Sequence, residues 1–315
     1  MSRPNLEQHR AELTGYCYRM LGSAFEAEDA VQETMLRAWR NLSRYDPARA
    51  SPRTWLFQIA TNICLDMLKG ARRRARAMDL GPASTLGSEL GAPLPEQAWV
   101  QPVPDAMVLP AGGDPAEVAV ARETVRLAFV AALQCLAPRQ RAVLILRDVL
   151  RWSAAEAAGL LGTSVAAVNS ALQRARAALP VAEPYQPMDA ERRALLERYV
   201  AAFERYDLEA LVATLHEDAT MSMPPFSWWL RGREQIRAAL IGSAGACEHS
   251  RLVPVQANGG PAFGQYDRHG RGFALVLAEV TDGLVSGITT YLAADRLFPL
   301  FGLPMSSPPP RRIPS

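Results

Sequence analysis

The chain has 315 residues, of which 49% are hydrophobic and 21% are charged, and its formal net charge is +2. This composition is typical of a folded protein with two or three domains and excludes an intrinsically disordered chain. No apolar run approaches the ~18 residues of a membrane span and the N-terminus has no signal-peptide core, so we expect a cytoplasmic protein without membrane insertion. The four cysteines form no CxxC pair and no cluster with histidine, which predicts reduced thiols, no metal site and no cofactor.

The charge is unevenly distributed along the chain. Residues 1–80 carry 13 basic and 9 acidic side chains, and residues 117–180 carry 8 basic and 4 acidic ones. Between them, residues 81–116 carry 4 acidic side chains and no basic one. Basic segments favour a polyanionic partner such as nucleic acid, whereas the acidic segment needs a different explanation.

Two helices are predicted at the N-terminus, over residues 6–21 and 26–41. The second has an inward apolar stripe and a largely acidic outer face with one apolar residue. The outer face consists of Asp29, Gln32, Glu33, Leu36 and Arg40. Such a face suits docking to a basic protein surface. The alternative is a solvated helix face, which periodicity alone favours.

A loop at residues 44–52, marked by Asp-Pro and Ser-Pro, precedes a long helix predicted over residues 53–76. Aromatic side chains stand near the start of this helix, and its polar face becomes strongly basic toward its end. Rings beside amides and a basic tail suit single-stranded nucleic acid, where bases stack and phosphates are neutralised. The alternative is that Trp55 and Phe57 belong to the core, and we favour this for Trp55. The polar face comprises Gln58, Thr61, Asn62, Lys69, Arg72, Arg73 and Arg76.

Residues 80–113 are rich in proline and glycine, which predicts a long, acidic and extended linker. After the linker, an Asp-Pro-Ala-Glu run at residues 114–117 predicts a capped helix that continues to about residue 136. Pro138 opens a further helix that is expected to reach residue 150.

Residues 152–179 predict a helix-turn-helix. Ser153 and Glu156 form a capping box, Gly162 ends the first helix, and Ser164 caps the second. In the second helix, Val165, Val168, Leu172, Ala175 and Leu179 form one buried stripe. Off this stripe lie residue types that read base edges and grip phosphates, which favours DNA reading over an alanine-rich surface helix. These residues are Asn169, Ser170, Gln173, Arg174 and Arg176.

The helical segments, in this order, resemble a known family. The runs DAVQETMLRAWRNLSRYD and TWLFQIATNICLDMLKGARRR resemble the second conserved region of extracytoplasmic-function RNA polymerase sigma factors. The run LAPRQRAVLILRDVLRWSAAEAAGLLGTSVAAVNSALQRARAAL resembles their fourth region. The resemblance implies two all-α modules, region 2 at 1–80 and a helix-turn-helix region 4 at 115–180, joined by the acidic linker at 81–114. It also implies core RNA polymerase and promoter DNA as partners.

The resemblance implies roles for particular residues. The clamp helices of the polymerase β′ subunit would bind Asp29, Gln32, Glu33 and Leu36, and the β flap is a further expected contact. The linker would pass through polymerase channels that otherwise carry nucleic acid. The −35 element would be read by the exposed residues of the second helix named above, with Arg176 on phosphate. The −10 element would be bound and melted by Tyr45, Asp46, Arg49, Ser51, Gln58, Asn62, Lys69, Arg72 and Arg73.

Two features depart from the family pattern. Asn169 and Gln173 stand where many relatives carry arginine or an aromatic residue, and the linker is longer than in the smallest members. Both leave the promoter sequence open.

The C-terminal third predicts an α+β domain. After a connector at 181–189, one or two helices are expected over 190–213, then a strand, a helix over 231–243 and further antiparallel strands. The runs AFERYDLEALVATLHEDATMSMPP, LRGREQIRAAL, NGGPAF and ITTYLAADRLFPLFGLP resemble the SnoaL-like domain, a cone-shaped α+β barrel. We therefore expect a SnoaL-like regulatory domain at 190–304 that acts in cis, followed by a disordered tail at 305–315.

The interior of this domain either holds a small-molecule ligand or is simply filled by its own side chains. The lining residues would be Met221, Met223, Phe226, Trp228, Trp229 and Tyr266. A separate anti-sigma protein is a further candidate partner.

Catalysis is the competing interpretation of the C-terminal third, because SnoaL-like folds include cyclases and isomerases with an Asp or His base. The candidates are His216, Asp218, His249 and Asp267. We expect a structural cap at Asp218 and solvated histidines, so the chain is predicted not to be an enzyme. The alternatives are an enzyme with a DNA-binding leader and a helix-turn-helix regulator that acts without polymerase.

Overall fold

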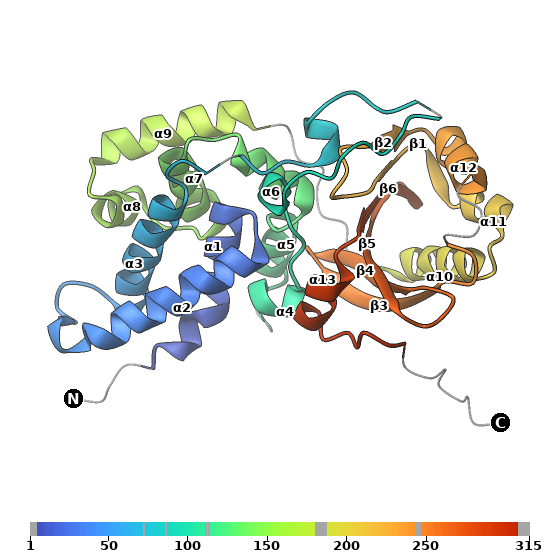
Figure 1. Cartoon of the computed structure of the whole chain (residues 1–315). Helices are drawn as coiled ribbons and strands as arrows, with labels where there is room; N and C mark the ends of the chain where they lie inside the picture. Colours follow the sequence, from blue (N-terminus) through green and yellow to red (C-terminus); the bar gives the residue numbers. More distant parts are fainter. Residues whose placement is uncertain are drawn as a thin grey trace. The chain divides into compact units, whose positions relative to one another are not determined.

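The computed structural model describes residues 5–71, 73–85, 87–110, 112, 114–179, 188–242 and 247–307. The predictions for Arg72, for residues 181–187 of the connector and for the tail beyond residue 307 lie outside these residues. The chain divides into two compact units. Unit 1 comprises Met1–Arg76 with Gln97–Tyr185, and unit 2 comprises Ala77–Glu96 with Gln186–Ser315. In Figure 1 the described part of unit 1 is helical, whereas unit 2 is built around a sheet.

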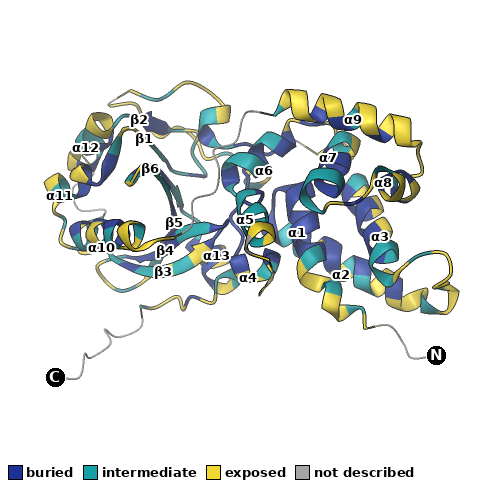
Figure 2. Ribbon diagram, turned by 180° about the vertical axis from the view of Figure 1, so that it is seen from behind, coloured by how far each residue is buried: buried dark blue, intermediate teal, exposed yellow. Residues whose placement is uncertain are grey.

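The first half of unit 1 contains three main helices that follow the predicted periodicity. Ser23 caps α2 by accepting a hydrogen bond from the Glu26 N–H, and Ser51 caps α3 by accepting one from the Thr54 N–H. Nearly all of α1 is buried, which Figure 2 shows as a dark ribbon. The helices are α1 (Arg10–Leu21), α2 (Ala24–Arg40) and α3 (Pro52–Met67), and one turn of 3₁₀-helix (Glu7–His9) precedes them.

The prediction that the third helix continues to residue 76 is wrong, because α3 ends at Met67. Gly70 has a left-handed backbone with φ of 76°. Beyond it the chain is extended, since Ala75 forms a parallel bridge with Trp99 and its N–H donates to the Ala98 carbonyl over 2.8 Å. The basic segment that follows α3 is therefore hydrogen-bonded to the end of the linker.

The second half of unit 1 contains the predicted helix-turn-helix with its capping box. The helix expected over residues 114–136 is instead two helices. The Arg19 side chain donates a hydrogen bond to the Thr124 carbonyl, which therefore does not accept the backbone hydrogen bond that would continue the helix. The elements are α4 (Asp105–Val108), α5 (Pro115–Glu123), α6 (Leu127–Gln134), α7 (Pro138–Leu144), a π-helical turn (Ile145–Val149), α8 (Ala154–Leu161) and α9 (Val165–Ala178).

Unit 2 contains a six-stranded sheet with the order β2-β1-β6-β5-β4-β3. All pairs are antiparallel except β1 with β6, so the expectation of an antiparallel sheet is wrong at that pair. The expected helices and strands are present, while β2 and α13 were not predicted. The elements are α10 (Ala190–Glu204), α11 (Leu208–Ala213), β1 (Leu215–Ser222), β2 (Trp229–Arg231), α12 (Arg233–Gly242), β3 (Arg251–Ala257), β4 (Gly260–Tyr266), β5 (Gly272–Thr281), β6 (Leu284–Tyr291) and α13 (Ala294–Leu300).

Helices cover both faces of the sheet. The main core lies on the face toward α10, α11 and α12 and includes Tyr199, Leu230 and Phe263. On the opposite face, the ring of Phe298 from α13 lies so close to Gly272 that a Cβ there would be 2.7 Å from it. Glycine at this position is therefore required for α13 to pack against the sheet.

Candidate nucleic-acid and protein interfaces

The outer face of α2 carries the predicted docking residues. Asp29, Gln32 and Leu36 are exposed, while Glu33 is half-buried and forms an ion pair with Arg37 over 2.6 Å. The buried side of the helix consists of small residues and one valine. The four predicted residues therefore share one accessible helix face.

Trp39 belongs to the same surface and was missed in the sequence. Its side chain is 69% exposed, the most among the exposed large apolar residues described, and Leu36 three positions before it is 40% exposed. Residues three apart are neighbours on a helix surface. The signal was available, because Trp39 falls off the buried stripe that includes Ala38. Together, Leu36 and Trp39 form an apolar strip beside acidic side chains.

A pocket of about 320 Å³ lies between the end of α2 and the outer face of α3. Of the predicted residues only Asn62 lines it. Trp55, which we expected in the core, is half-buried at this pocket, whereas Phe57 is fully buried. The remaining lining residues are Arg37, Asn41, Arg44 and Ile59. The pocket thus combines an indole face with amide and guanidinium donors.

The predicted loop at residues 45–51 borders this pocket through Tyr45, whose ring lies 4.9 Å from that of Trp55. The Tyr45 hydroxyl donates to the Ala50 carbonyl over 3.0 Å, and the Asp46 carboxylate accepts from the Ala48 N–H over 2.9 Å. Asp46 therefore shapes the loop, as Ser51 does by capping α3. The Arg49 side chain is exposed and has no partner among the described residues.

The remaining predicted residues of α3 and its basic tail are accessible. Gln58 and Asn62 are exposed one helical turn apart, and Arg73 is exposed. Lys69 forms an exposed ion pair with Asp66 over 2.6 Å. Thr61, which we expected on the polar face, is buried and hydrogen-bonded to the Tyr16 hydroxyl over 2.8 Å.

On α9, four of the five predicted DNA-reading residues are exposed and form no ion pair with another described residue: Asn169, Ser170, Gln173 and Arg174. Figure 2 shows the exposed face along this helix. Arg176 is also exposed but forms a bidentate ion pair with Asp148, with donor–acceptor distances of 2.6 and 2.9 Å. This carboxylate raises the pKa of Arg176 and competes with any phosphate for the guanidinium.

The predicted buried stripe of α9 is wrong at its first residue and holds only in part at its last, because Leu179 is half-buried. Val168, Leu172 and Ala175 are buried, but Val165 is 44% exposed. Val165 is the first residue of the helix, directly after the cap Ser164, and it precedes the first buried residue of the helix, Val168. An exposed methyl-bearing side chain at this end of the second helix of a helix-turn-helix is chemically suited to contact a thymine methyl group.

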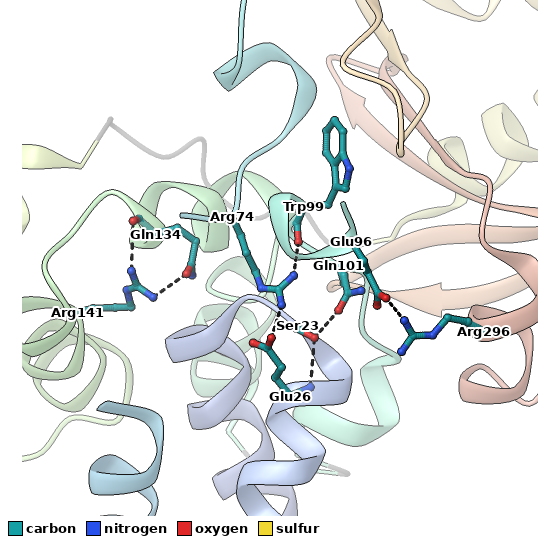
Figure 3. Close-up of polar contacts among 9 residues, drawn as sticks. All are labelled: Ser23, Glu26, Arg74, Glu96, Trp99, Gln101, Gln134, Arg141 and Arg296. Atoms are coloured by element: carbon teal, nitrogen blue, oxygen red, sulfur yellow. Dashed lines mark hydrogen bonds and ion pairs between the residues drawn. The ribbon is translucent and has the colours of Figure 1, made fainter. Parts of the chain in front are cut away.

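The two halves of unit 1 are joined by buried arginines. Arg19 of α1 is 3% exposed and donates to the Gly15 carbonyl over 2.8 Å and to the Thr124 hydroxyl over 2.8 Å. Arg141 of α7 donates to the Met20 carbonyl. It also donates to the Gln134 side-chain carbonyl (Figure 3). Burial lowers the pKa of each guanidinium to about 10. Within the described chain, neither has a carboxylate partner.

An aromatic contact joins the halves at a second point. The ring of Trp152, at the start of the helix-turn-helix, lies 5.4 Å from that of Phe57 on α3 and 4.9 Å from the Arg53 guanidinium. Arg53 is in turn held by a bidentate ion pair with Glu12. The inner face of the aromatic helix α3 is therefore covered by the helix-turn-helix module.

The linker is not uniformly extended, and its second half packs against region 2. Val100, Val103 and Val108 are at most 5% exposed. The Gln101 N–H donates to the Gly22 carbonyl over 2.9 Å, and the Tyr18 hydroxyl donates to the Gln101 carbonyl over 2.7 Å. The side chain of Gln101 also bonds Ser23 (Figure 3). Residues 97–109 are therefore part of the core of unit 1.

The first half of the linker, residues 77–96, belongs to unit 2. The Trp229 indole N–H donates to the Gly81 carbonyl over 3.0 Å, and the Ser84 N–H donates to the Trp229 carbonyl over 2.7 Å. Glu96 forms an ion pair with Arg296 of α13 (Figure 3). The C-terminal domain thus holds an acidic loop whose two ends return to the Ala75–Trp99 bridge.

The six residues predicted to line a ligand pocket do not share one space. Met221 and Trp228 pack on the core face of the sheet. Tyr266 lies on the opposite face, where its ring packs edge-on against Phe298 and its hydroxyl donates to the Pro304 carbonyl over 2.9 Å. Trp229 is bound to the linker. Met223 and Phe226 are half-buried in the segment between β1 and β2.

The candidate catalytic residues are likewise apart from one another. Asp218 is exposed on β1 rather than in the expected cap, and the His216 Nδ1 accepts from its N–H over 3.1 Å. His249 is exposed. Asp267 accepts from the N–H groups of His269 and Arg271, which lowers its pKa. Among the residues that the structure describes, no helix is long and apolar enough to cross a membrane, and no metal-binding group of acidic, His or Cys side chains occurs.

Comparisons with known proteins match all three parts of the chain. The family model Sigma-70 region 2 matches residues 6–74, Sigma-70 region 4 matches residues 126–179, and the SnoaL-like domain matches residues 196–292. The ECF RNA polymerase sigma factor SigG of Mycobacterium tuberculosis is 45% identical over 312 residues, covering 95% of this chain and 83% of that protein. SigJ of the same organism is 32% identical over 225 residues, covering 70% of this chain and 64% of that protein. The crystal structure of SigJ matches with a TM-score of 0.60 and 26% identity, covering 96% of this chain and 98% of that one.

Proposed function

Since the chain belongs to the ECF sigma factors of RNA polymerase, we propose that its SnoaL-like domain regulates this sigma factor in cis by holding the linker. As a sigma factor it directs promoter-specific initiation of transcription and is not an enzyme. We assign −10 recognition to residues 1–80, −35 recognition to 115–180 and regulation to 190–304. The cytoplasm, which holds polymerase and promoter DNA, is its expected place of action.

The polymerase contact is proposed for the outer face of α2. Leu36 and Trp39 supply an exposed apolar strip, and Asp29 and Glu33 supply negative charge beside it. Interfaces draw most of their affinity from a few such aromatic and apolar side chains, while the surrounding charges steer the partner. We propose that the clamp helices of the β′ subunit bind this face.

The −10 contact is proposed for the pocket beside Trp55. Its indole and the adjacent Tyr45 ring offer a stacking surface for an unpaired base, and Asn41 and Asn62 offer amides for the edge of that base. Gln58, Lys69 and Arg73 are also exposed and add polar and positively charged side chains to region 2. This supports a flipped non-template base as the occupant of the pocket.

Promoter binding requires unit 1 to open. A compact unit of about 165 residues has a radius of gyration of ~15 Å and a diameter of ~40 Å. The centres of a −35 and a −10 element lie about 25 base pairs apart, which is ~85 Å along B-DNA. The helix α9 and the pocket at α3 therefore cannot reach both elements while Arg19, Arg141 and Trp152 join the two halves. We infer that the packed unit is the resting state.

The hydrogen bond from Trp229 to Gly81 is the observation that carries the regulatory proposal. A linker held by the C-terminal domain is not free to enter polymerase, so release of residues 77–96 accompanies activation. Trp229→Phe keeps an aromatic ring but removes the N–H donor. Loss of one hydrogen bond of about 1 kcal/mol raises the released fraction ~5-fold, so we expect higher transcription at limiting sigma factor.

The experiment is in vitro transcription with core polymerase on the upstream region of the gene itself, comparing full-length wild type with Trp229→Phe. The matched control is Trp228→Phe, because this neighbouring indole packs on the sheet core and bonds no linker residue in the described chain. Equal transcription from all three proteins contradicts regulation through the linker. Absence of transcription from all of them contradicts the assignment of these promoters.

A further inference from the structure

A second cavity, of about 430 Å³, lies where the region 2 helices meet the region 4 helices in unit 1. This volume is in the range of small-molecule sites. Met67 and Leu68 contribute apolar surface from the end of α3, and Pro138 does so from the start of α7. The cavity therefore exists only while the two halves of unit 1 are packed together.

The charge around this cavity is unbalanced. Three arginines line it, Arg73, Arg74 and Arg141, and the one carboxylate among its lining residues is Glu26. Glu26 already forms an ion pair with Arg74, with an Nη2–Oε1 distance of 2.5 Å (Figure 3). Two positive charges are therefore left without an opposite charge in the lining.

These two remaining arginines differ in what they offer a ligand. Arg141 is 4% exposed, its Nη atoms donate to carbonyl oxygens, and its Nε has no hydrogen-bond partner. Arg73 is exposed and has no ion pair or hydrogen bond within the described residues. The charge of Arg73 also contributes to lowering the pKa of Arg141, after the larger effect of burial, so the two cations repel each other across the cavity. A bound dianion would relieve this repulsion.

We propose that this cavity binds a phosphorylated small molecule with an apolar or planar body, its phosphate facing Arg73 and Arg141 and its body against Met67, Leu68 and Pro138. A phosphate monoester carries close to two negative charges at neutral pH, which matches the surplus of the lining. Guanidinium groups are suited to phosphate oxygens because they present several N–H donors in a plane.

Such a ligand would hold region 2 and region 4 together, because its contacts come from both. A ligand that binds only the packed form shifts the equilibrium toward it, by about 11-fold at ten times the dissociation constant. Transcription would therefore fall as the ligand accumulates. This consequence depends on the opening proposed above, whereas binding itself does not involve polymerase.

The test of binding is calorimetry on the full-length protein with adenosine 5′-monophosphate, inorganic phosphate and neutral adenosine as probes. We expect the nucleotide to bind more tightly than phosphate and adenosine not to bind. Arg73→Gln should weaken nucleotide binding at least 10-fold. Ala71→Glu, which adds a negative charge to the lining and leaves every arginine in place, should do the same.

Lys69→Gln is the matched control, because it removes one charge from the same basic tail at a residue that does not line the cavity. Its affinity for the nucleotide should equal that of the wild type. Equal weakening by Lys69→Gln and Arg73→Gln, or no binding of either phosphate probe at millimolar concentration, overturns the proposal. An effect of Arg73→Gln on promoter DNA alone would also overturn it and leave Arg73 as a DNA contact only.

Discussion

At the scale of single residues, the proposed resting state contains two buried cations without a counter-charge among the described residues. Arg19 and Arg141 are held by carbonyl oxygens rather than by carboxylates, and burial lowers the pKa of each to about 10. Burying a charge without an opposite charge is costly, even where hydrogen bonds satisfy its donors. A carboxylate partner would make the packing of region 2 on region 4 harder to undo. The absence of such carboxylates among the described residues fits our proposal that this interface opens.

Arg176 is a residue whose availability for DNA is set by one neighbour. Asp148→Asn weakens the bidentate ion pair and frees the guanidinium for a phosphate. We expect the holoenzyme to bind a −35 duplex a few-fold more tightly. The slope of log affinity against log salt concentration should become steeper by about 0.9. Glu117→Gln, which removes an exposed acidic charge from the same module, should leave the slope unchanged. An unchanged slope in Asp148→Asn would show that Arg176 does not contact phosphate.

Trp39 allows binding to be separated from stability. Because its side chain is 69% exposed, Trp39→Ala should change the free energy of unfolding by less than about 0.5 kcal/mol. Loss of an aromatic anchor should weaken the affinity for core polymerase at least ~10-fold. Fluorescence titration with core polymerase measures the affinity, and Glu197→Ala at an exposed position of α10 is the control. Wild-type affinity in Trp39→Ala would remove this residue from the docking face.

At the scale of elements, local patterns predicted the helices and long-range contacts decided the rest. The faces of α2 and α9 follow from the 3.6-residue period, and the caps at Ser23, Ser153 and Ser164 are readable from a few neighbouring residues. The break at Thr124 depends on Arg19, more than 100 positions away in the chain. The end of α3, the pocket at Trp55 and the parallel pairing of β1 with β6 likewise depend on distant segments. No local period encodes such contacts.

The capping box of α8 makes the stability of this helix depend on pH. The Glu156 carboxylate accepts from the Ser153 N–H over 2.7 Å, and its hydrogen bonds with Ser153 lower its pKa below the usual 4.5. A carboxylate with a lowered folded-state pKa adds stability above its unfolded pKa, and this contribution is lost as the pH falls through the folded value. We therefore expect the capping contribution to the melting temperature to decline below about pH 4.5.

Glu156→Gln keeps a hydrogen-bond acceptor without the charge and should remove this part of the pH dependence. Ser153→Ala should cost about 1 kcal/mol at neutral pH. The measurement is thermal unfolding of the full-length protein between pH 3 and 7, compared with the wild type. The same loss of stability between pH 5 and 3 in wild type and Glu156→Gln would contradict the assignment.

At the scale of the whole molecule, two separate attachments hold the proposed resting state. One joins region 2 to region 4 through Arg19, Arg141 and Trp152, and the other joins residues 77–96 to the C-terminal domain. The Ala75–Trp99 bridge lies at the base of the held loop. Proposed activation therefore has two steps that different substitutions can affect independently.

Hydrogen exchange can follow the release of residues 97–109 from region 2. The N–H groups of Ala75, Val100 and Gln101 are hydrogen-bonded to linker or region 2 carbonyls, so they should exchange slowly in the free protein. Binding of core polymerase should accelerate their exchange, whereas the N–H groups within β5, in the middle of the sheet, should stay protected. Unchanged exchange at residues 97–109 in a transcribing complex would contradict the release of this half of the linker.

The buried second half of the linker also limits how far the two DNA-binding modules can separate. While residues 97–109 stay packed, only five residues, 110–114, connect region 2 to α5, and they span at most ~18 Å. Peeling away residues 97–109 gives 18 free residues and ~60 Å, and freeing residues 77–96 as well gives ~130 Å. The distance that the linker can span therefore rises in two increments, and in our proposal the C-terminal domain controls the second. We expect this domain to act as a selector of promoter spacing, with widely spaced elements served only after it releases its loop.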